Sequence, residues 1–376
     1  MSLKYDVIIS GAGPSGSLLA FLLSSINIKT LVLEKKSFPR PKICAGGLQH
    51  RAARLLPFSI DPVVEKIIYG VYFSYRSKHI FDRTYHVPLI YMLDRAKFDQ
   101  FLAEKARQAG SDYHYECPAT DYEVSNNYIT VKTPKKVFTS RLLVGADGAR
   151  GMVHRKLVSN KQLFKIIGYE FELGRNKVNG HLNLNRNIAI DIGGVKGGYA
   201  WVFPKNKNLS IGIGGPHYDA RHIKKYFKKF LSRYVLFEDI ISDVKIYGQC
   251  IPVRKADTPI CDYRVLAIGD AAGLGDAFTG EGLFNCFKSA LLASESINRA
   301  LTQGNFTFED YGRKIADIVY EDIRISMLFS KLFFLFPFLI YNILKKNDKI
   351  FDVCCQVLRG DKSYKHLAQK LKIFKY

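Results

Sequence analysis

The sequence predicts an α/β fold in which a Rossmann-like domain is interleaved with an antiparallel-sheet domain and followed by a C-terminal helical region. Three observations predict it. The chain opens with an apolar strand, a glycine turn, a helix and a second apolar strand, which is the order of a parallel βαβ unit. Residues 165–216 read as alternating and aromatic strands separated by glycine turns, which favours an antiparallel sheet. An apolar strand at residues 265–270 then returns to the first domain.

The first βαβ unit begins at the fifth residue. YDVIIS (5–10) and KTLVLEKK (29–36) are apolar runs of strand length. Between them, PSGSLLAFLLSSI (14–26) has the length and composition of a buried helix. Parallel strands need such a crossover, so these three segments predict the start of a parallel sheet.

The later elements alternate between the two domains. They are an amphipathic helix at 94–109 with Phe98, Phe101, Leu102 and Ala106 on one face, a hairpin at 126–148 that leads into the buried strand 142–144, and a long helix at 280–301. The predicted domains are residues 1–70, 90–160 and 255–300 for the Rossmann-like domain, 71–89 and 161–254 for the β-rich domain, and 301–376 for the C-terminal helical region.

The composition is strongly basic. The 376 residues carry 56 Lys and Arg against 34 Asp and Glu, a formal net charge of +22. This charge suits an anionic membrane surface or an anionic substrate, or reflects only a bias toward lysine. No nucleic-acid module is recognised, so we expect no nucleic-acid partner. The seven cysteines have no metal-ligand spacing, and the N-terminus leads directly into a strand; we expect no metal, no signal peptide and a cytoplasmic location.

The turn after the first strand reads Gly11-Ala12-Gly13-Pro14-Ser15-Gly16. It follows a strand and opens a helix, which are the contexts that a dinucleotide-binding fingerprint requires. Gly11 makes the tight turn, Gly13 lets a pyrophosphate approach the backbone, and Gly16 lets helix and strand pack closely. Glu34 ends the next strand, where its carboxylate is placed to accept from a ribose hydroxyl.

Two further strands end in glycine and aspartate. LLVGADGAR (142–150) contains Asp147, and VLAIGDAAGLGDAFTGEG (265–282) contains Asp270. Ligands of open α/β sheets bind at the carboxyl ends of the strands. Three such turns on one chain predict an extended dinucleotide.

These three motifs together resemble the FAD-binding fold of p-hydroxybenzoate-hydroxylase-type flavoproteins over residues 5–300. The resemblance implies FAD as cofactor, held in part by Arg95 before the helix at 94–109. In such proteins Asn-Pro usually precedes the FTGEG segment; Asp276-Ala277 stand there instead, which predicts a looser loop. The residues expected to bind FAD are Gly11, Gly13, Pro14, Ser15, Gly16, Glu34, Lys35, Cys44, Ala45, Gly46, Arg95, Asp147, Gly148, Gly269, Asp270, Gly280, Gly282 and Leu283.

A narrower resemblance rests on YAWVFP (199–204), seven residues and then Gly-x-Gly, together with PKICAGG (41–47). These resemble the geranylgeranyl reductase family, which saturates isoprenoid double bonds with reduced FAD. The resemblance implies a long isoprenoid substrate, geranylgeranyl diphosphate or a geranylgeranylated phospholipid. Tyr199, Trp201 and Phe203 share one face of a strand and form either a substrate wall or part of the core.

Cys44 lies on a proline- and glycine-rich loop that is expected to pass the flavin edge. Its thiol is a candidate catalytic proton donor, a residue that shapes the flavin site, or incidental. The sequence has no second Gly-x-Gly-x-x-Gly motif that would bind a nicotinamide nucleotide. The electron donor is therefore expected to be reduced ferredoxin, a quinol or NADPH that binds transiently. A flavin monooxygenase or halogenase on the same fold, and a non-enzymatic flavin-binding membrane protein, are the alternative functions.

Two segments are candidates for membrane contact. Residues 220–234 place lysines and Arg221 on one helical face and Ile223, Phe227 and other apolar residues on the opposite face. This helix either lies on anionic headgroups or docks on the protein. Residues 327–346 are the most apolar stretch, but Lys331 and Pro337 argue against a full span. They favour a kinked, half-buried surface that collects lipid, peripheral to the membrane, with a buried core helix as the alternative.

Overall fold

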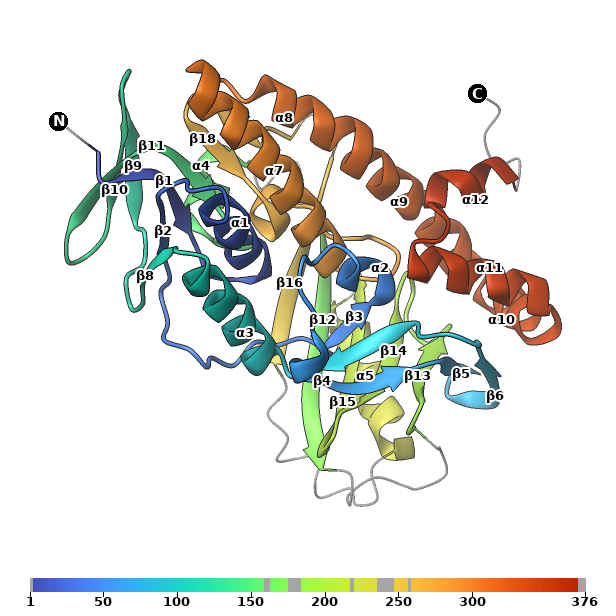
Figure 1. Cartoon of the computed structure of the whole chain (residues 1–376). Helices are drawn as coiled ribbons and strands as arrows, with labels where there is room; N and C mark the ends of the chain where they lie inside the picture. Colours follow the sequence, from blue (N-terminus) through green and yellow to red (C-terminus); the bar gives the residue numbers. More distant parts are fainter. Residues whose placement is uncertain are drawn as a thin grey trace.

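The computed structural model of the chain describes residues 3–158, 163–174, 184–216, 220–234, 247–255 and 258–370 (Figure 1). It contains two large sheets and a smaller one, and the C-terminal helices lie at the end of the molecule opposite to strands β9 (Asp121–Val124) and β10 (Ile129–Lys132) (Figure 1).

The first sheet has the parallel centre that the sequence predicts. β1 (Tyr5–Ser10) pairs in parallel with β2 (Thr30–Leu33) on one side and with β11 (Val137–Gly145) on the other. The strand order is β17-β18-β11-β1-β2-β8, and the β9–β10 hairpin joins β11. The remaining strands of this path are β8 (Asp112–His114), β17 (Cys261–Asp262) and β18 (Val265–Ala267).

Helices cover both faces of this sheet, because β1 is apolar on both. Val7 and Ile9 pack with α1 (Pro14–Ser24), α3 (Arg95–Gln108) and α7 (Leu283–Gln303), whereas Ile8 packs with α4 (Met152–Leu157). Asp94 caps α3 by accepting a 2.8 Å hydrogen bond from the amide of Ala96.

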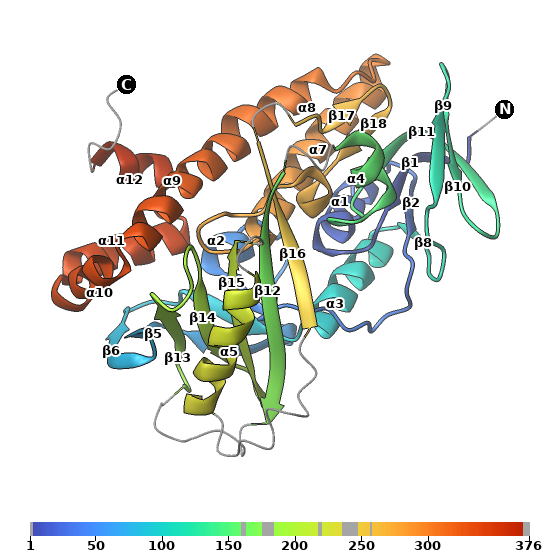
Figure 2. The same ribbon diagram turned by 180° about the vertical axis from the view of Figure 1, so that it is seen from behind.

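The second sheet has the order β16-β12-β15-β14-β13-β5-β6 and is antiparallel except for the parallel pair of β5 and β13. Helix α5 (Ala220–Tyr234) packs on one of its faces (Figure 2). Its strands are β5 (Gly70–Tyr75), β6 (Lys78–Thr84), β12 (Leu163–Gly174), β13 (Asn187–Ile192), β14 (Tyr199–Pro204), β15 (Asn208–Pro216) and β16 (Tyr247–Arg254).

A small antiparallel sheet with the strand order β3-β7-β4 is formed by the segments that connect the two large sheets. Its elements and the short helices near it are β3 (Gly47–Gln49), α2 (His50–Ala53), a 3-10 turn (Asp61–Val63), β4 (Val64–Ile68) and β7 (Ile90–Leu93). A second 3-10 turn, Gly269–Ala272, follows β18.

The C-terminal region is helical, and the kink predicted at Pro337 is confirmed. Pro337 is the first residue of a helix that is bent by 95° from the preceding one. Within the described part of the chain no single helix has the length and apolarity of a membrane span, and this bent pair passes that test only when its two arms are taken together. The elements are α8 (Glu309–Lys314), a π-helical segment (Ile315–Tyr320), α9 (Glu321–Leu335), α10 (Pro337–Lys346), α11 (Asp348–Arg359) and α12 (Tyr364–Lys370).

Candidate active site

One cavity of about 1350 Å³ joins the three regions of the protein. It begins at the glycine turn after β1, passes β14 of the second sheet and ends among the helices α9 to α12. Most of the exposed surface inside it belongs to apolar atoms. Large apolar cavities with a few polar groups are the usual sites of small-molecule binding.

The glycine turn has the geometry of a phosphate-binding loop. Gly11 has φ +104°, and a Cβ atom there would lie 2.5 Å from the carbonyl oxygen of Ala146. Gly13 lies open to the cavity, since an added Cβ would meet nothing within 4 Å. Pro14 and Ser15, the first residues of α1, also line the cavity, so the helix N-terminus is placed to bind an anionic group there through the backbone amides that follow Pro14.

Glu34 lies where the sequence predicts it, at the end of β2 beside this turn. Its two carboxylate oxygens accept hydrogen bonds from the amides of Ala12 at 2.9 Å and Lys36 at 3.1 Å. A carboxylate oxygen has a second lone pair, so the side chain can still accept from ribose hydroxyls. Lys35 lines the same part of the cavity.

Asp147 carries an unpaired acceptor that fits a bound cofactor. Oδ2 accepts from the amide of Val153 at 2.8 Å, whereas Oδ1 is buried and accepts from no described residue. Burial raises the pKa of this carboxyl. A hydroxyl or amide donor of FAD would satisfy Oδ1, and both Asp147 and Gly148 line the cavity.

Basic side chains that sequence reasoning missed surround Arg95. Arg95 donates to Asp99 at 2.9 Å, and Arg40 lies 3.4 Å from the same carboxylate. Lys42 lines the cavity nearby, and burial together with the charge of Arg95 lowers its pKa. Arg40 also lies 3.7 Å from Glu34, so these basic side chains line the crevice beside the carboxylates of Asp99 and Glu34, where they can contact the diphosphate of a dinucleotide.

The loop before α7 is held by Asp276. Its Oδ1 accepts from the amides of Phe278 at 2.8 Å and Thr279 at 3.1 Å, and its carbonyl accepts from the amide of Gly280. These bonds hold the turn in the absence of a proline, and the expectation of a looser loop stays a prediction. The loop lies beside the Gly-Asp motif, because a Cβ on Gly282 would lie 3.4 Å from Oδ1 of Asp270. Leu283 begins α7 and lines the cavity.

Three predicted cofactor residues do not line the cavity and serve packing instead. A Cβ on Gly16 would lie 2.0 Å from the carbonyl oxygen of Gly11. A Cβ on Gly46 would lie 2.2 Å from the carbonyl oxygen of Leu93, and one on Gly269 would lie 2.9 Å from Ser15 Oγ. Sequence spacing identified these glycines as part of the motifs, but it does not distinguish contact with a ligand from contact with the protein. Cys44 and Ala45, by contrast, line the cavity.

Tyr199, Trp201 and Phe203 form one wall of the cavity. Their ring centroids are 5.8 Å and 6.4 Å apart along β14. The residues between them, Ala200 and Val202, point to the other face and pack in the core beneath α5. The aromatic face is therefore the cavity face of the strand and not its core face.

The Gly-x-Gly of the same motif has a steric reason. On β15, Gly214 is paired with Tyr199 and Gly212 with Trp201. A Cβ on Gly212 would lie 2.1 Å from the indole ring of Trp201. The glycine thus provides the space in which the ring lies flat against the sheet.

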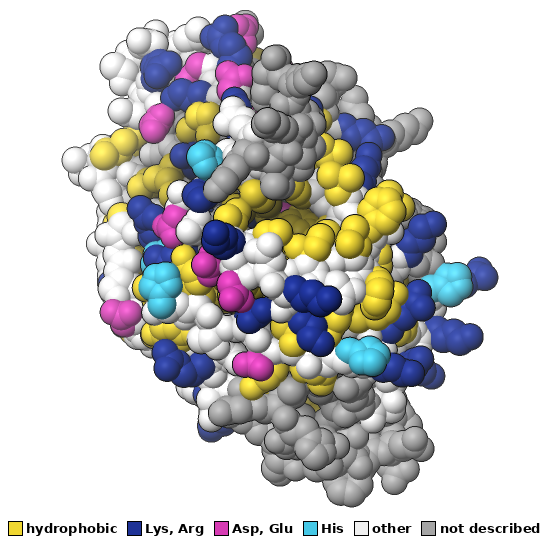
Figure 3. All heavy atoms as spheres, turned by 90° about the vertical axis from the view of Figure 1, so that its right-hand side faces the viewer, with side chains coloured by type: hydrophobic (Ala, Val, Ile, Leu, Met, Phe, Trp, Pro, Cys, Tyr) yellow, Lys and Arg dark blue, Asp and Glu magenta, His cyan; other side chains and the backbone are white. Residues whose placement is uncertain are grey.

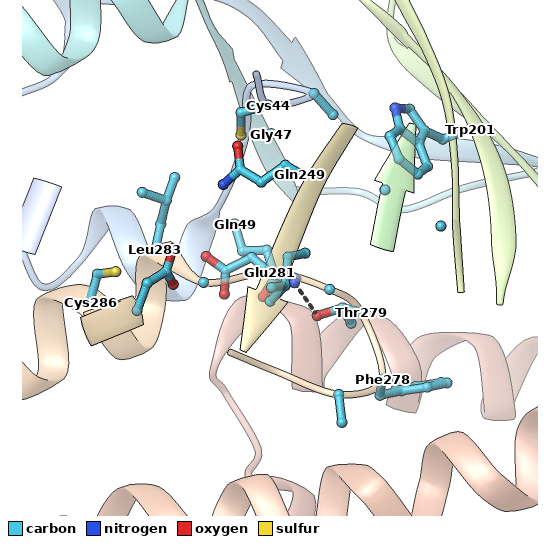
Figure 4. Close-up of a pocket in the computed structure, with 18 of the residues that line it drawn as sticks. Cys44, Gly47, Gln49, Trp201, Gln249, Phe278, Thr279, Glu281, Leu283 and Cys286 are labelled. Atoms are coloured by element: carbon cyan, nitrogen blue, oxygen red, sulfur yellow. Dashed lines mark hydrogen bonds between the residues drawn. The ribbon is translucent and has the colours of Figure 1, made fainter. Parts of the chain in front are cut away.

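Three polar side chains that the sequence analysis did not single out reach the cavity near Cys44. Figure 4 shows Gln249 of β16 beneath Cys44, with Gln49 and Glu281 below it. They come from three distant segments of the chain, so no local pattern in the sequence brings them together.

Helix α5 does not present an apolar face to a membrane. Ile223, Phe227, Phe230 and Leu231 are fully buried against the second sheet, while Arg221 and Lys225 are exposed. Of the two alternatives for this helix, docking on the protein is confirmed and the membrane-lying helix is wrong. Helical periodicity predicts that α5 has an apolar face, but it does not predict whether a sheet or a membrane covers that face.

Comparisons with known proteins agree with this site. Residues 4–172 match the family model of an FAD binding domain. An uncharacterized protein of Methanosarcina barkeri is 30% identical over 333 residues, covering 88% of this chain and 84% of that protein. A digeranylgeranylglycerophospholipid reductase of Methanocaldococcus jannaschii is 26% identical and covers 87% of this chain and 86% of its own.

Solved structures share the fold at lower identity. A geranylgeranyl bacteriochlorophyll reductase-like protein of Thermoplasma acidophilum superposes with a TM-score of 0.80 at 20% identity, over 99% of both chains. A flavin-dependent brominase superposes with a TM-score of 0.72 at 20% identity, over 95% of this chain and 93% of its own. The fold is thus common to reductase-like proteins and halogenating enzymes.

The fold and the cofactor crevice define an FAD-dependent oxidoreductase. Within that class, the chain belongs to the geranylgeranyl reductase family, and FAD is its cofactor.

Proposed function

We propose that this protein saturates the double bonds of a long isoprenoid chain carried by a diphosphate or a glycerophospholipid. The observation that carries the proposal is the continuous cavity from the FAD-binding residues, past the aromatic wall, to the apolar helices α9 to α12. A small polar substrate would need no such length of apolar surface. The names of the curated relatives, digeranylgeranylglycerophospholipid reductases, support the same substrate class.

FAD, once reduced, would supply the hydride. The chain's own residues would bind and orient the alkene. Tyr199, Trp201 and Phe203 present ring faces along which a flexible hydrocarbon can lie, and they keep water from that side of the cavity. Reduced ferredoxin, a quinol or NADPH would reduce the oxidised flavin again after each turnover.

The substrate would enter from an anionic membrane surface. At the corner between α9 and α10, Leu335, Phe336, Phe338 and Leu339 each expose 54% to 65% of their surface. Phe333, Phe334, Ile340 and Leu344 of the same helices line the cavity. One pair of helices thus joins an exposed apolar surface to the interior, as a peripheral lipid enzyme requires.

Positive charge borders this corner. Lys331 precedes it, and Lys345, Lys346 and Lys349 follow it, all exposed. Figure 3 views this end of the molecule, where hydrophobic side chains surround a hollow and basic side chains lie around them. Clusters of this kind favour acidic lipid headgroups, which supports peripheral attachment.

Anaerobic single turnover tests the reaction. The FAD-loaded protein is reduced with dithionite under argon and mixed with geranylgeranyl diphosphate or a geranylgeranylated glycerophospholipid. Reoxidation of the flavin together with a gain of two hydrogens per double bond, seen by mass spectrometry, is expected. Reoxidation that requires oxygen would instead support the monooxygenase or halogenase reaction, for which the shared fold is the argument. No turnover under either condition would support a non-enzymatic flavin-binding role.

A further inference from the structure

A buried cluster of charges lies at the point where the cofactor residues meet the aromatic wall. Arg51 of α2 lies 3.3 Å from a carboxylate oxygen of Asp276 and 3.8 Å from one of Glu281. The side chains of Asp276 and Glu281 are only 5% and 9% exposed. One guanidinium therefore faces two buried carboxyl groups. Two carboxylates that share one buried cation do not both ionise readily, so one of them retains a proton near neutral pH.

The hydrogen bonds decide which carboxyl group retains the proton. Asp276 accepts from two backbone amides, those of Phe278 and Thr279, and is the nearer of the two to Arg51. Glu281 accepts from the amide of Phe284 at 2.8 Å and lies 3.8 Å from Arg51. Hydrogen bonds and a close cation favour the charged form of a carboxylate, so we assign the proton to Glu281, the carboxyl group that lies farther from Arg51.

The titration of Glu281 agrees with this assignment. Burial raises the pKa of Glu281 to about 7, against the opposing effect of Arg51. The other titratable groups that face the cluster include Tyr199, Cys286 of α7, Asp322 of α9 and Tyr364 of α12, and burial raises the pKa of each of them. None of these groups is a cation, so none favours the charged form of Glu281.

Glu281 is also the member of the cluster that reaches the cavity. It lies between Gly280 and Gly282, which line the same cavity, while Arg51 and Asp276 lie behind the wall. A Cβ on Gly282 would lie 3.4 Å from the cofactor residue Asp270, and one on Gly280 would lie 3.8 Å from the hydroxyl of Tyr199. In Figure 4 the side chain of Glu281 lies in the space below Gln249 and Cys44.

We propose that Glu281 is the proton donor of the reduction. This rests on the proposed function. The π bond of the alkene breaks, one carbon takes a hydride from the reduced flavin, and the other takes the proton of the Glu281 carboxyl. Two C–H bonds form, the flavin is oxidised by two electrons, and Glu281 is left as a carboxylate that solvent protonates again.

Tyr199 is a poorer donor for this step. Its hydroxyl already donates to the carbonyl oxygen of Thr279, and burial raises its pKa. Transfer of its proton would break that hydrogen bond and leave a buried phenolate beside Asp276 and Glu281. A neutral carboxyl group next to Arg51 loses its proton with less cost, because the guanidinium stabilises the carboxylate that results.

Infrared spectroscopy of the oxidised, FAD-loaded protein tests the proton directly. The carbonyl stretch of a protonated carboxyl group is expected in the wild type at pH 6, to fade as the pH rises through about 7, and to be absent from Glu281→Gln. Glu295→Gln, a change at an exposed glutamate of α7, serves as control and keeps the band. A wild type that lacks a carboxyl band titrating in this range would overturn the proposal.

Single turnover then tests the transfer. Glu281→Gln is expected to retain its FAD and to be reduced by dithionite, yet to lose about 10²–10⁴-fold in the rate of alkene reduction. The wild-type rate is expected to fall tenfold per pH unit above about 7, which gives a second test if the variant does not fold. A variant as fast as the wild type, or a flat wild-type profile, would overturn Glu281 as donor while leaving the proposed reductase intact. A titrating band in a protein that reduces no alkene would instead count against the proposed function.

Discussion

Trp201 and Gly212 lie opposite each other on neighbouring antiparallel strands, and a Cβ atom at residue 212 would lie 2.1 Å from the indole ring. The two positions of the motif are therefore a single steric unit. The bare backbone on β15 fixes where the ring on β14 lies in the cavity.

Gly212→Ala is expected to displace the indole and to reduce alkene turnover at least tenfold, with FAD content unchanged. Overpacking of this kind costs about 1–3 kcal/mol, which a protein of this size tolerates. Gly168→Ala is the matched control, since a Cβ there would lie 3.8 Å from the same ring, an ordinary contact. Equal turnover in both variants would contradict a role for the ring position.

Trp201→Ala should leave a soluble, yellow protein with little isoprenoid reduction, because the indole faces the cavity. Val202→Ala, its neighbour on the core face, should show the reverse: a loss of about 2 kcal/mol in the free energy of unfolding and near-normal turnover. Denaturant unfolding and single-turnover assays of both variants measure the difference. An insoluble Trp201→Ala protein would show that the ring belongs to the core.

Asp147→Asn should weaken FAD binding by about 10- to 100-fold, because the buried Oδ1 no longer offers a charged acceptor. Since burial raises the pKa of Asp147, the folded apoprotein holds a proton more tightly than the unfolded chain. The ionised carboxylate thus costs stability above the raised pKa, and this cost is relieved as the pH falls through it. The apoprotein of the variant should therefore melt higher than the wild-type apoprotein at neutral pH, and the difference should shrink in acid. Fluorescence titration and thermal melts are the measurements.

FAD should be held without a covalent bond. The residues that face the cofactor crevice act through hydrogen bonds and charge, as Glu34 and Asp147 do. Acid precipitation should leave the yellow colour in the supernatant. Flavin that stays with the precipitate would contradict this expectation.

Phe338→Glu should abolish binding to vesicles of phosphatidylglycerol and phosphatidylcholine in a sedimentation assay, while turnover of detergent-dispersed substrate stays within about twofold. Val137→Glu, at the opposite end of the molecule, is the control, because both side chains are 58% exposed and the charge change is the same. Loss of vesicle binding in both variants would point to net charge alone.

Cys44→Ser should lower alkene reduction by less than tenfold. Cys44 lines the cavity, but with Glu281 as donor its thiol is not needed for the proton. A loss of more than a hundredfold at unchanged FAD content, about the contribution of a general acid, would assign the proton to Cys44 instead.

The sequence alone determined the cofactor crevice and the aromatic strand. Both depend on short-range patterns: a glycine turn between strand and helix, and aromatic residues at every second position of a strand. The backbone converts such patterns into geometry over a few residues, so Gly13, Glu34 and Trp201 lie where the sequence predicts them.

The tertiary structure decided what covers each surface and which distant groups meet. The apolar face of α5 is buried by a sheet whose strands come from other parts of the chain, and periodicity describes only the face. Arg51 and Asp276 are 225 residues apart in the sequence but in contact in the fold. Because Arg51 lies closer to Asp276 than to Glu281, Glu281 is the carboxyl group that we expect to retain a proton. Charge and burial act through space, whereas a motif acts along the chain, and for that reason the proton-bearing cluster is visible only in the folded protein.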